Sequence, residues 1–236
     1  MREDPGAPFG DAHGFGDLLD SARQVAGQDF HSEATRLQGG DRGGDPHAPR
    51  WIIDPLDGTT NFAHGLPLFS VSIACEVDGE LAVGVVAAPA LGLVFAAARG
   101  QGARRNGEPI RVSAVDALDS ALLVTGFPYD RRTARENNFA QFVALKKKAQ
   151  GIRRFGSAAL DLAFTAAGSF DGYWEMRLSP WDIAAGILIV QEAGGTVTDW
   201  RGDPVSLARC EVLATNGQIH GAVSAVLAST PHGQLT

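Results

Sequence analysis

Two aspartates that follow an apolar stretch are the residues of this chain best placed to do chemistry together. Asp54 and Asp57 come directly after Trp51 to Ile53, and Pro55 stiffens the turn between them. Hard divalent cations take carboxylate and carbonyl oxygens as ligands. Paired carboxylates at the end of a buried strand therefore favour a cation site.

A small residue and two hydroxyls follow this pair. Gly58, Thr59 and Thr60 stand where a helix could begin, and the free amides at a helix N-terminus attract phosphate oxygens. The same residue types also populate turns and helix caps for purely local reasons. The full run, together with a second acidic site downstream, favours adjoining cation and phosphate sites over a simple turn.

The second acidic site is Asp182, which follows Pro180 and Trp181 at the start of a predicted apolar helix from Ile183 to Ala193. An aspartate at this position could simply be a helix cap that accepts backbone hydrogen bonds. A helix also fixes a carboxylate within the tolerance that a metal ion requires. Both roles are open for Asp182 on its sequence position alone.

Length and composition indicate an ordinary globular protein. The chain has 236 residues, of which 44% are hydrophobic and 20% are charged, and this suffices for a large core. Its net charge of -7 opposes general binding to nucleic acid, since such binding requires a basic surface. An acidic protein that binds phosphate must neutralise it locally, and metal ions would do so.

Several other classes of protein are disfavoured. Cys75 and Cys210 are the only cysteines, too few for a disulfide scaffold and not spaced as a zinc motif. No run approaches the roughly 20 apolar residues of a membrane span, and the N-terminus lacks the features of a secretory signal. We therefore expect a cytoplasmic protein with no membrane partner.

Apolar periodicity predicts strands in the first half of the chain and alternating helices and strands in the second. A hairpin is expected from Phe69 to Ala88, with its turn at Asp78 and Gly79. Further strands are expected at 93–98, 110–112, 196–198 and 211–214, and helices at 137–150, 157–167 and 183–193.

Two long motifs closely resemble the signatures of the inositol monophosphatase family. The first is Trp51 to Phe62 (WIIDPLDGTTNF), and the second combines Trp181 to Gly186 (WDIAAG) with Glu192 to Gly195 (EAGG). Shorter stretches at 98–107 and 156–159 are similar to the family pattern as well. The resemblance implies a lithium-sensitive, Mg²⁺-dependent phosphomonoesterase with a layered α-β-α-β-α sandwich, an α/β fold.

The resemblance also implies metal ligands. Asp54, Asp57, Asp182 and the backbone carbonyl of Leu56 would hold two or three Mg²⁺ ions, and Asp54 would bridge two of them. The amides of residues 58–60 would bind phosphate oxygens.

An upstream glutamate completes the implied set. Family members carry a Glu-Glu pair before the first signature, and the best match here is Glu33, followed by Ala34 in place of the second glutamate. The first glutamate of the pair contacts metal and, with the threonine matching Thr59, orients the attacking water. Loss of the second would weaken an additional metal interaction.

Three further residues match family positions in the substrate pocket. Glu175 matches the position that hydrogen-bonds a substrate hydroxyl, and Ser157 and Ala158 match positions that line the same pocket. A solvated surface glutamate and a helix N-cap are the plain alternatives, because such residue types are common in both settings.

The N-terminal part departs from the family pattern. Family members carry two long helices before the glutamate pair, whereas residues 1–30 show only a brief helical pattern at 17–25. We expect a divergent or truncated segment at 1–30, with the helical part shortened or missing. A single phosphatase domain is expected at 31–236, with the metal-site sheet half at 31–120 and a C-terminal α/β half at 121–236.

The function predicted on this basis is hydrolysis of inositol monophosphate, or of a related small polyol or sugar phosphate, by direct attack of a metal-activated water. Relatives specific for fructose 1,6-bisphosphate, a nucleotide 3'-phosphate or histidinol phosphate are alternatives, because the metal core is shared. A different class of protein, a catalytically impaired metal-binding interaction protein, is the non-enzyme alternative. The family resemblance also favours a homodimer.

Overall fold

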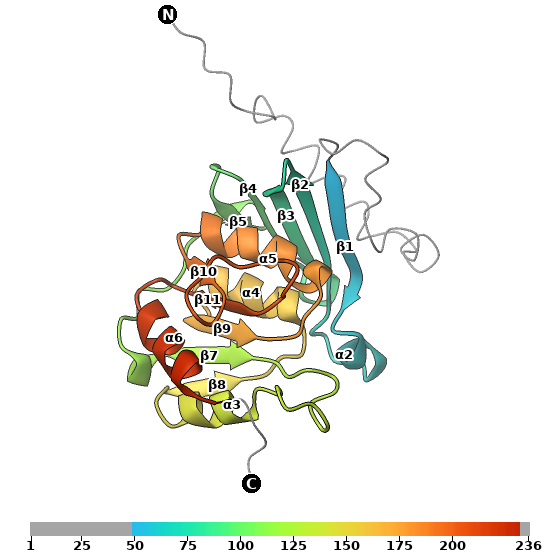
Figure 1. The fold of residues 1–236 in the computed structure, drawn as a ribbon. Helices are drawn as coiled ribbons and strands as arrows, with labels where there is room; N and C mark the ends of the chain where they lie inside the picture. The colour runs from blue at the N-terminus through green and yellow to red at the C-terminus, as the bar shows by residue number, and fades with distance from the viewer. Residues whose placement is uncertain (1–48, 232–236) are drawn as a thin grey trace, which may run out of the picture.

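Two β-sheets with a pair of helices between them form the frame of the protein (Figure 1). The computed structural model describes residues 49–231. The first sheet is an antiparallel meander in which neighbours in sequence are neighbours in space. Its strands, in order, are β1 (Arg50–Asp57), β2 (Ser70–Val77), β3 (Glu80–Ala88), β4 (Leu93–Ala98), β5 (Ala103–Arg105) and β6 (Glu108–Ile110).

The second sheet is mixed, with the strand order β10-β11-β9-β7-β8. Strand β7 pairs in parallel with both β8 and β9, and the other pairs are antiparallel. Parallel neighbours require crossover connections, and here the segment that holds α3 (Phe139–Lys146) links β7 to β8. The bounds are β7 (Leu122–Thr125), β8 (Gly151–Arg153), β9 (Gly172–Glu175), β10 (Thr196–Thr198) and β11 (Val212–Thr215).

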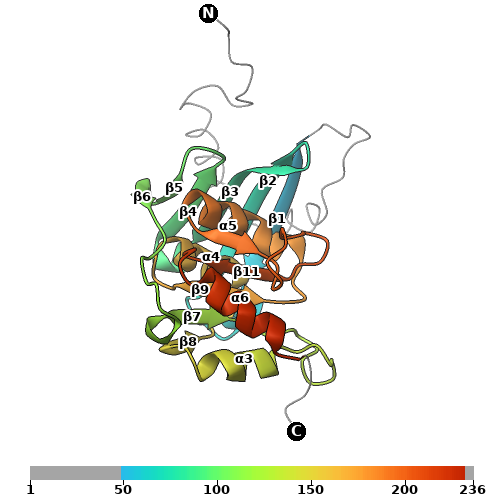
Figure 2. The same cartoon turned by 60° about the vertical axis from the view of Figure 1, so that its left-hand side comes forward.

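The helices form layers on this frame. Helices α4 (Ala158–Ala166) and α5 (Pro180–Glu192) lie between the sheets, while α3 (Phe139–Lys146) and α6 (His220–Ser229) cover the other face of the second sheet (Figures 1 and 2). A short helix, α2 (Thr59–Ala63), follows β1. Two 3₁₀ turns, η2 (Pro89–Leu91) and η3 (Leu118–Ser120), complete the set within residues 49–231.

Alternation along the strands divides the core into layers. In β1, Ile52 belongs to the cluster that joins the first sheet to α4 and α5, and Ile53 belongs to the cluster on the opposite face. In β9, Tyr173 faces the same central helices, whereas Trp174 packs in the cluster with α3 and α6. Successive side chains of a strand point to opposite faces, so one strand serves two apolar layers.

The expected α/β sandwich is confirmed, and most predicted elements lie close to their expected bounds. The strand predicted at 110–112 was wrong in position, because pairing with β5 places it at Glu108–Ile110. The helix predicted at 137–150 begins only at Phe139, since Asn138 is left-handed with φ of 69°. The predicted helical pattern at 17–25, and any shortening of the N-terminal helices, lie outside the described residues.

Candidate active site

Three carboxylates from distant parts of the chain converge at the end of β1. Asp54, Asp57 and Asp182 each bring one oxygen within 4.8 Å of those of the other two. The first two lie on β1, and the third lies in the first turn of α5. The folded chain therefore brings together the two acidic sites of the sequence.

An irregularity in β1 lets its two aspartates share one face. Side chains three apart in a regular strand point to opposite faces. Asp54 pairs with Ser72, whereas Asp57 pairs with Ser70, so three steps on β1 oppose two on β2. A bulge of this kind re-aims a side chain and restores both aspartates to the same side.

The carboxylate of Asp57 is buried and anchored to the start of α4. Its Oδ2 accepts a hydrogen bond of 2.5 Å from the Ser157 hydroxyl and one of 2.9 Å from the amide of Ala159. Ser157 is also the N-cap of α4 and accepts a bond from the amide of Leu160. The N-cap interpretation of Ser157 was thus correct, and the same hydroxyl fixes a predicted metal ligand.

Asp182 likewise combines a cap with membership of the cluster. Its Oδ2 accepts a 2.7 Å bond from the amide of Ser179, and the Ser179 side chain in turn caps the amide of Asp182, which completes a capping box. Asp54 is held in a similar way, because its Oδ1 accepts a 3.0 Å bond from the amide of Leu56. Together with the amide of Ala159 on Asp57, backbone amides therefore orient all three carboxylates.

The turn after Asp57 depends on a glycine. Gly58 has φ of 83°, and a Cβ at this position would lie 2.8 Å from the carbonyl oxygen of Leu68. Only glycine fits such a left-handed turn against another backbone segment. The Thr59 hydroxyl donates a 2.9 Å hydrogen bond to the carbonyl of Leu56, which is the predicted backbone ligand.

The side chain of Asn61 fixes this turn to the rest of the site. Its Nδ2 donates to the carbonyls of Leu68 and Phe155, at 2.6 and 2.7 Å. The residue is buried on a helix of five residues, too short to be stable by its own hydrogen bonds. Asn61, Ser157 and the amide of Ala159 are supporting groups whose contacts the sequence motifs did not reveal.

Burial and mutual repulsion disfavour the ionised forms of the three aspartates. Burial raises the pKa of Asp57 to about 7, and the charges of Asp54 and Asp182 add to the rise against the opposing hydrogen bonds. Burial, joined by the charge of Asp54, raises the pKa of Asp182 to about 6. Burial also raises the pKa of Asp54. An oxygen-only ligand set that repels itself in this way suits a hard divalent cation.

Glu175 is buried at the end of β9, so the solvated-surface interpretation was wrong. It is 8% exposed, and its Oε2 accepts a 2.9 Å hydrogen bond from the Tyr173 hydroxyl. Burial raises the pKa of Glu175 to about 8, although the bond from Tyr173 opposes the rise. The negative charge of Asp57 also raises the pKa of Glu175, so the two carboxyl groups interact electrostatically.

The other predicted site residues have different positions. Ala158 begins α4 and is buried in the central apolar cluster. Thr60 is exposed in the first turn of α2. Glu33 lies outside the described residues, as does its neighbour Ala34. The predicted roles of all these residues in metal, phosphate and substrate binding stay predictions.

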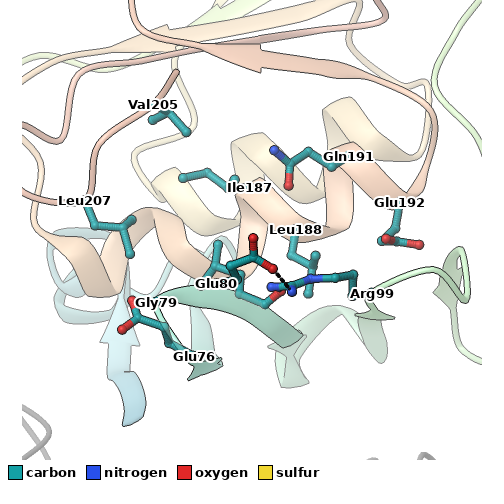
Figure 3. A pocket seen from close by; sticks show the side chains of 11 residues that line it. Glu76, Gly79, Glu80, Arg99, Ile187, Leu188, Gln191, Glu192, Val205 and Leu207 are labelled. Atoms are coloured by element: carbon teal, nitrogen blue, oxygen red, sulfur yellow. Dashed lines mark hydrogen bonds and ion pairs between the residues drawn. The ribbon is translucent and has the colours of Figure 1, made fainter. Parts of the chain in front are cut away.

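A separate groove lies along α5, toward the end opposite Asp182 (Figure 3). Its cavity volume is about 570 Å³, and its walls come from the β2–β3 hairpin, α5 and the segment around Val205. The Glu192 carboxylate accepts hydrogen bonds from the amides of Gly100 and Gly102, and Arg99 pairs with Glu80. Glu192, the first residue of the EAGG part of the second motif, therefore stabilises the turn between β4 and β5.

Among residues 49–231, none of the helices is long and apolar enough to cross a bilayer.

The layered fold and the acidic site agree with comparisons to known proteins. Residues 18–232 match the Inositol monophosphatase family. The structure of inositol monophosphatase from Anabaena is similar with a TM-score of 0.78 and 42% identity, over 92% of this chain and 88% of that one. The chain belongs to the inositol monophosphatase family.

Two curated relatives show the range of names in this family. Inositol-1-monophosphatase from Synechocystis is 51% identical over 181 residues, which cover 77% of this chain and 63% of the relative. Nus factor SuhB from Pseudomonas aeruginosa is 50% identical over 168 residues, covering 70% of this chain and 62% of that protein. The chain thus spans somewhat less than two thirds of the length of these two relatives.

Proposed function

We propose that the protein is a metal-dependent phosphomonoesterase that hydrolyses inositol monophosphate or a related small polyol or sugar phosphate. The observation that carries this proposal is the convergence of Asp54, Asp57 and Asp182 within 4.8 Å. Family membership supports it, because these residues stand in the two motifs shared with the family. The relative from Synechocystis bears the name of this activity.

The three carboxylates and the carbonyl of Leu56 would hold Mg²⁺, with Glu33 as a further ligand. When bound, such ions would lower the pKa of a water and neutralise charge on the phosphate. The amides of residues 58–60 would bind phosphate oxygens, and the left-handed Gly58 helps to expose them. Thr59 and Glu33 would orient the attacking water.

The buried Glu175 would accept or donate a hydrogen bond to a hydroxyl of the leaving group. A site that hydrogen-bonds a hydroxyl rejects analogues that lack it, because a buried polar group is then left unpaired. This residue therefore supports a polyol substrate. Several points stay predictions of the family resemblance: the choice of Mg²⁺, two or three ions for each chain, inhibition by lithium and a homodimer. The cytoplasmic location stays a prediction from the sequence composition.

Steady-state hydrolysis of inositol 1-phosphate, with and without Mg²⁺, tests the proposal. Wild type should require Mg²⁺, and Asp57→Asn should lose nearly all turnover. Glu108→Gln, at an exposed position of β6, is a matched control that should behave as wild type. Metal-dependent turnover that persists in Asp57→Asn would contradict the assignment.

The second candidate function is an interaction protein that binds metal without turnover. The names of the SuhB relatives, called Nus factors, favour keeping this candidate. It predicts Mg²⁺ binding in calorimetry but no hydrolysis across a panel of phosphomonoesters. The same panel, with fructose 1,6-bisphosphate, a nucleotide 3'-phosphate and histidinol phosphate included, distinguishes the enzymatic alternatives.

A further inference from the structure

The connection between β7 and α3 begins directly against Glu175. A Cβ on Gly126 would lie 2.1 Å from both carboxylate oxygens of Glu175, so the backbone at Gly126 packs flat on that carboxylate. Any larger residue would displace the carboxylate. Residues 127–137, which carry no helix or strand, therefore extend from the place where the predicted substrate-binding group lies.

Hydrogen bonds join the two ends of this connection. The Nδ2 of Asn138 donates to the carbonyl of Gly126 at 2.7 Å and to Oγ1 of Thr125 at 2.9 Å. Its Oδ1 accepts a 2.7 Å bond from Nε1 of Trp174, the residue before Glu175. The base of the loop is thus fixed to β7 and β9 by a buried amide, beside Glu175.

An ion pair holds the middle of the loop over the same region. Asp130 and Arg177 pair at 2.5 Å between Oδ2 and NH2. Arg177 stands in the segment that joins Glu175 at the end of β9 to Asp182 in α5. The loop is therefore attached to the one stretch of chain that carries both a predicted substrate ligand and a predicted metal ligand.

Tyr129, next to Asp130, presents its ring at this position. Its side chain is 92% exposed, more than any other large hydrophobic residue of the described part of the chain. Tyr129 lies in the loop between Gly126, which packs on Glu175, and Asp130, which pairs with Arg177. Desolvation by nearby protein atoms raises the pKa of Tyr129, and the charges of Asp182, Asp57 and Glu175 raise it further.

We propose that Tyr129 determines specificity for substrates with a ring, by packing its aromatic face against the C–H surface of a cyclitol or sugar leaving group. The inference rests on the proposed phosphatase function. An aromatic ring suits this task because it is large, rigid and apolar on its face, so little conformational entropy is lost on contact. Glu175 supplies the polar half of the recognition, and Tyr129 supplies the apolar half.

Kinetics on two substrates test the inference. We would compare KM and kcat of wild type with those of Tyr129→Ala and Tyr129→Phe. The substrates are inositol 1-phosphate, which has a ring, and glycerol 2-phosphate, which has none. Tyr129→Ala should raise KM for inositol 1-phosphate by about three- to tenfold, the size of one aromatic contact. Its kcat, and both constants for glycerol 2-phosphate, should remain at wild-type values, and Tyr129→Phe should resemble wild type on both substrates.

Each other outcome has a distinct meaning. If wild type hydrolyses inositol 1-phosphate and Tyr129→Ala has the same KM for it, this inference is overturned and the proposed function is left intact. Absence of turnover by wild type on both substrates would overturn the proposed function and the inference together. A smaller species for Tyr129→Ala in sedimentation would show that the ring packs against a second copy of the chain, and would also overturn the inference.

Discussion

The hydroxyl of Ser157 donates a 2.5 Å hydrogen bond to Oδ2 of Asp57, across 100 positions of sequence. This bond joins the acidic end of β1 to the first turn of α4. Outer groups that orient metal ligands are often as important as the ligands themselves. The contact therefore ties a central helix to a predicted metal ligand of the first sheet.

Replacement of Ser157 by alanine should weaken metal binding. The variant keeps the amide of Ala159 on Oδ2 of Asp57 but loses the shorter bond, so the carboxylate is less well oriented. We expect the Mg²⁺ concentration for half-maximal activity to rise by about tenfold or more. Ser70→Ala is a matched control, because its Oγ lies 3.3 Å from Oγ of Ser157 but makes no bond to Asp57. An equal effect of both variants would contradict the prediction.

The stability of the metal-free protein should fall as pH rises. Burial raises the folded-state pKa of Asp182 to about 6, of Asp57 to about 7 and of Glu175 to about 8. The folded state then binds more protons than the unfolded state, so stability is fully present below pH of about 4 and is lost as pH passes through 6 to 8. Thermal unfolding in EDTA should show a lower Tm at pH 8 than at pH 5.

Asp57→Asn tests the origin of that pH dependence. The amide cannot ionise but can still accept the bonds from Ser157 and Ala159, so its Tm in EDTA should exceed that of wild type at pH 8. Added Mg²⁺ should stabilise wild type by mass action and stabilise the variant less. Glu108→Gln, at an exposed position, should show neither effect. A wild-type Tm in EDTA that rises between pH 5 and pH 8 would be inconsistent with repulsion among buried acids.

Gly58→Ala should destabilise the turn for two separable reasons. Its φ of 83° costs a residue with Cβ about 1–2 kcal/mol, and the Cβ would also lie 2.8 Å from the carbonyl oxygen of Leu68. Gly65→Ala is the control, because its φ is 71° but nothing lies within 4 Å of the added Cβ. Urea unfolding should therefore show a larger loss for Gly58→Ala, accompanied by loss of activity. Equal losses would mean that the steric contact is relieved by local movement.

Glu175→Gln should change recognition of the substrate more than the fold. Glutamine has nearly the same shape and keeps an acceptor for the Tyr173 hydroxyl, so the free energy of unfolding at pH 7 should change little. Replacement of the carboxyl by an amide should disturb its hydrogen bond to a substrate hydroxyl and lower kcat/KM for inositol 1-phosphate by about tenfold or more. Equal losses for phenyl phosphate, whose leaving group carries no free hydroxyl, would show that Glu175 acts on the metal cluster and not on a substrate hydroxyl.

Local sequence patterns were sufficient for the β2–β3 hairpin, for α4 and for α5. Each has a complete local signal, such as the Asp78-Gly79 turn or the apolar run after Pro180. Strands β7 and β9 and helix α6 were not predicted, although β7 and β9 form the centre of the second sheet. The two strands have only four residues each and gain stability from pairing with distant strands, and such short segments have ambiguous periodicity.

The chemical identity of the site was determined by the sequence itself, because the motifs around Asp54, Asp57 and Asp182 contain the oxygen ligands that a hard cation requires. The tertiary structure alone decided how these groups are held. Ser157 and the amide of Ala159 reach Asp57 only because α4 packs between the two sheets. Gly126 lies on Glu175 only because β7 and β9 are parallel neighbours. Burial and hydrogen-bond geometry depend on contacts between residues far apart in the chain, and no local pattern of residue types specifies them.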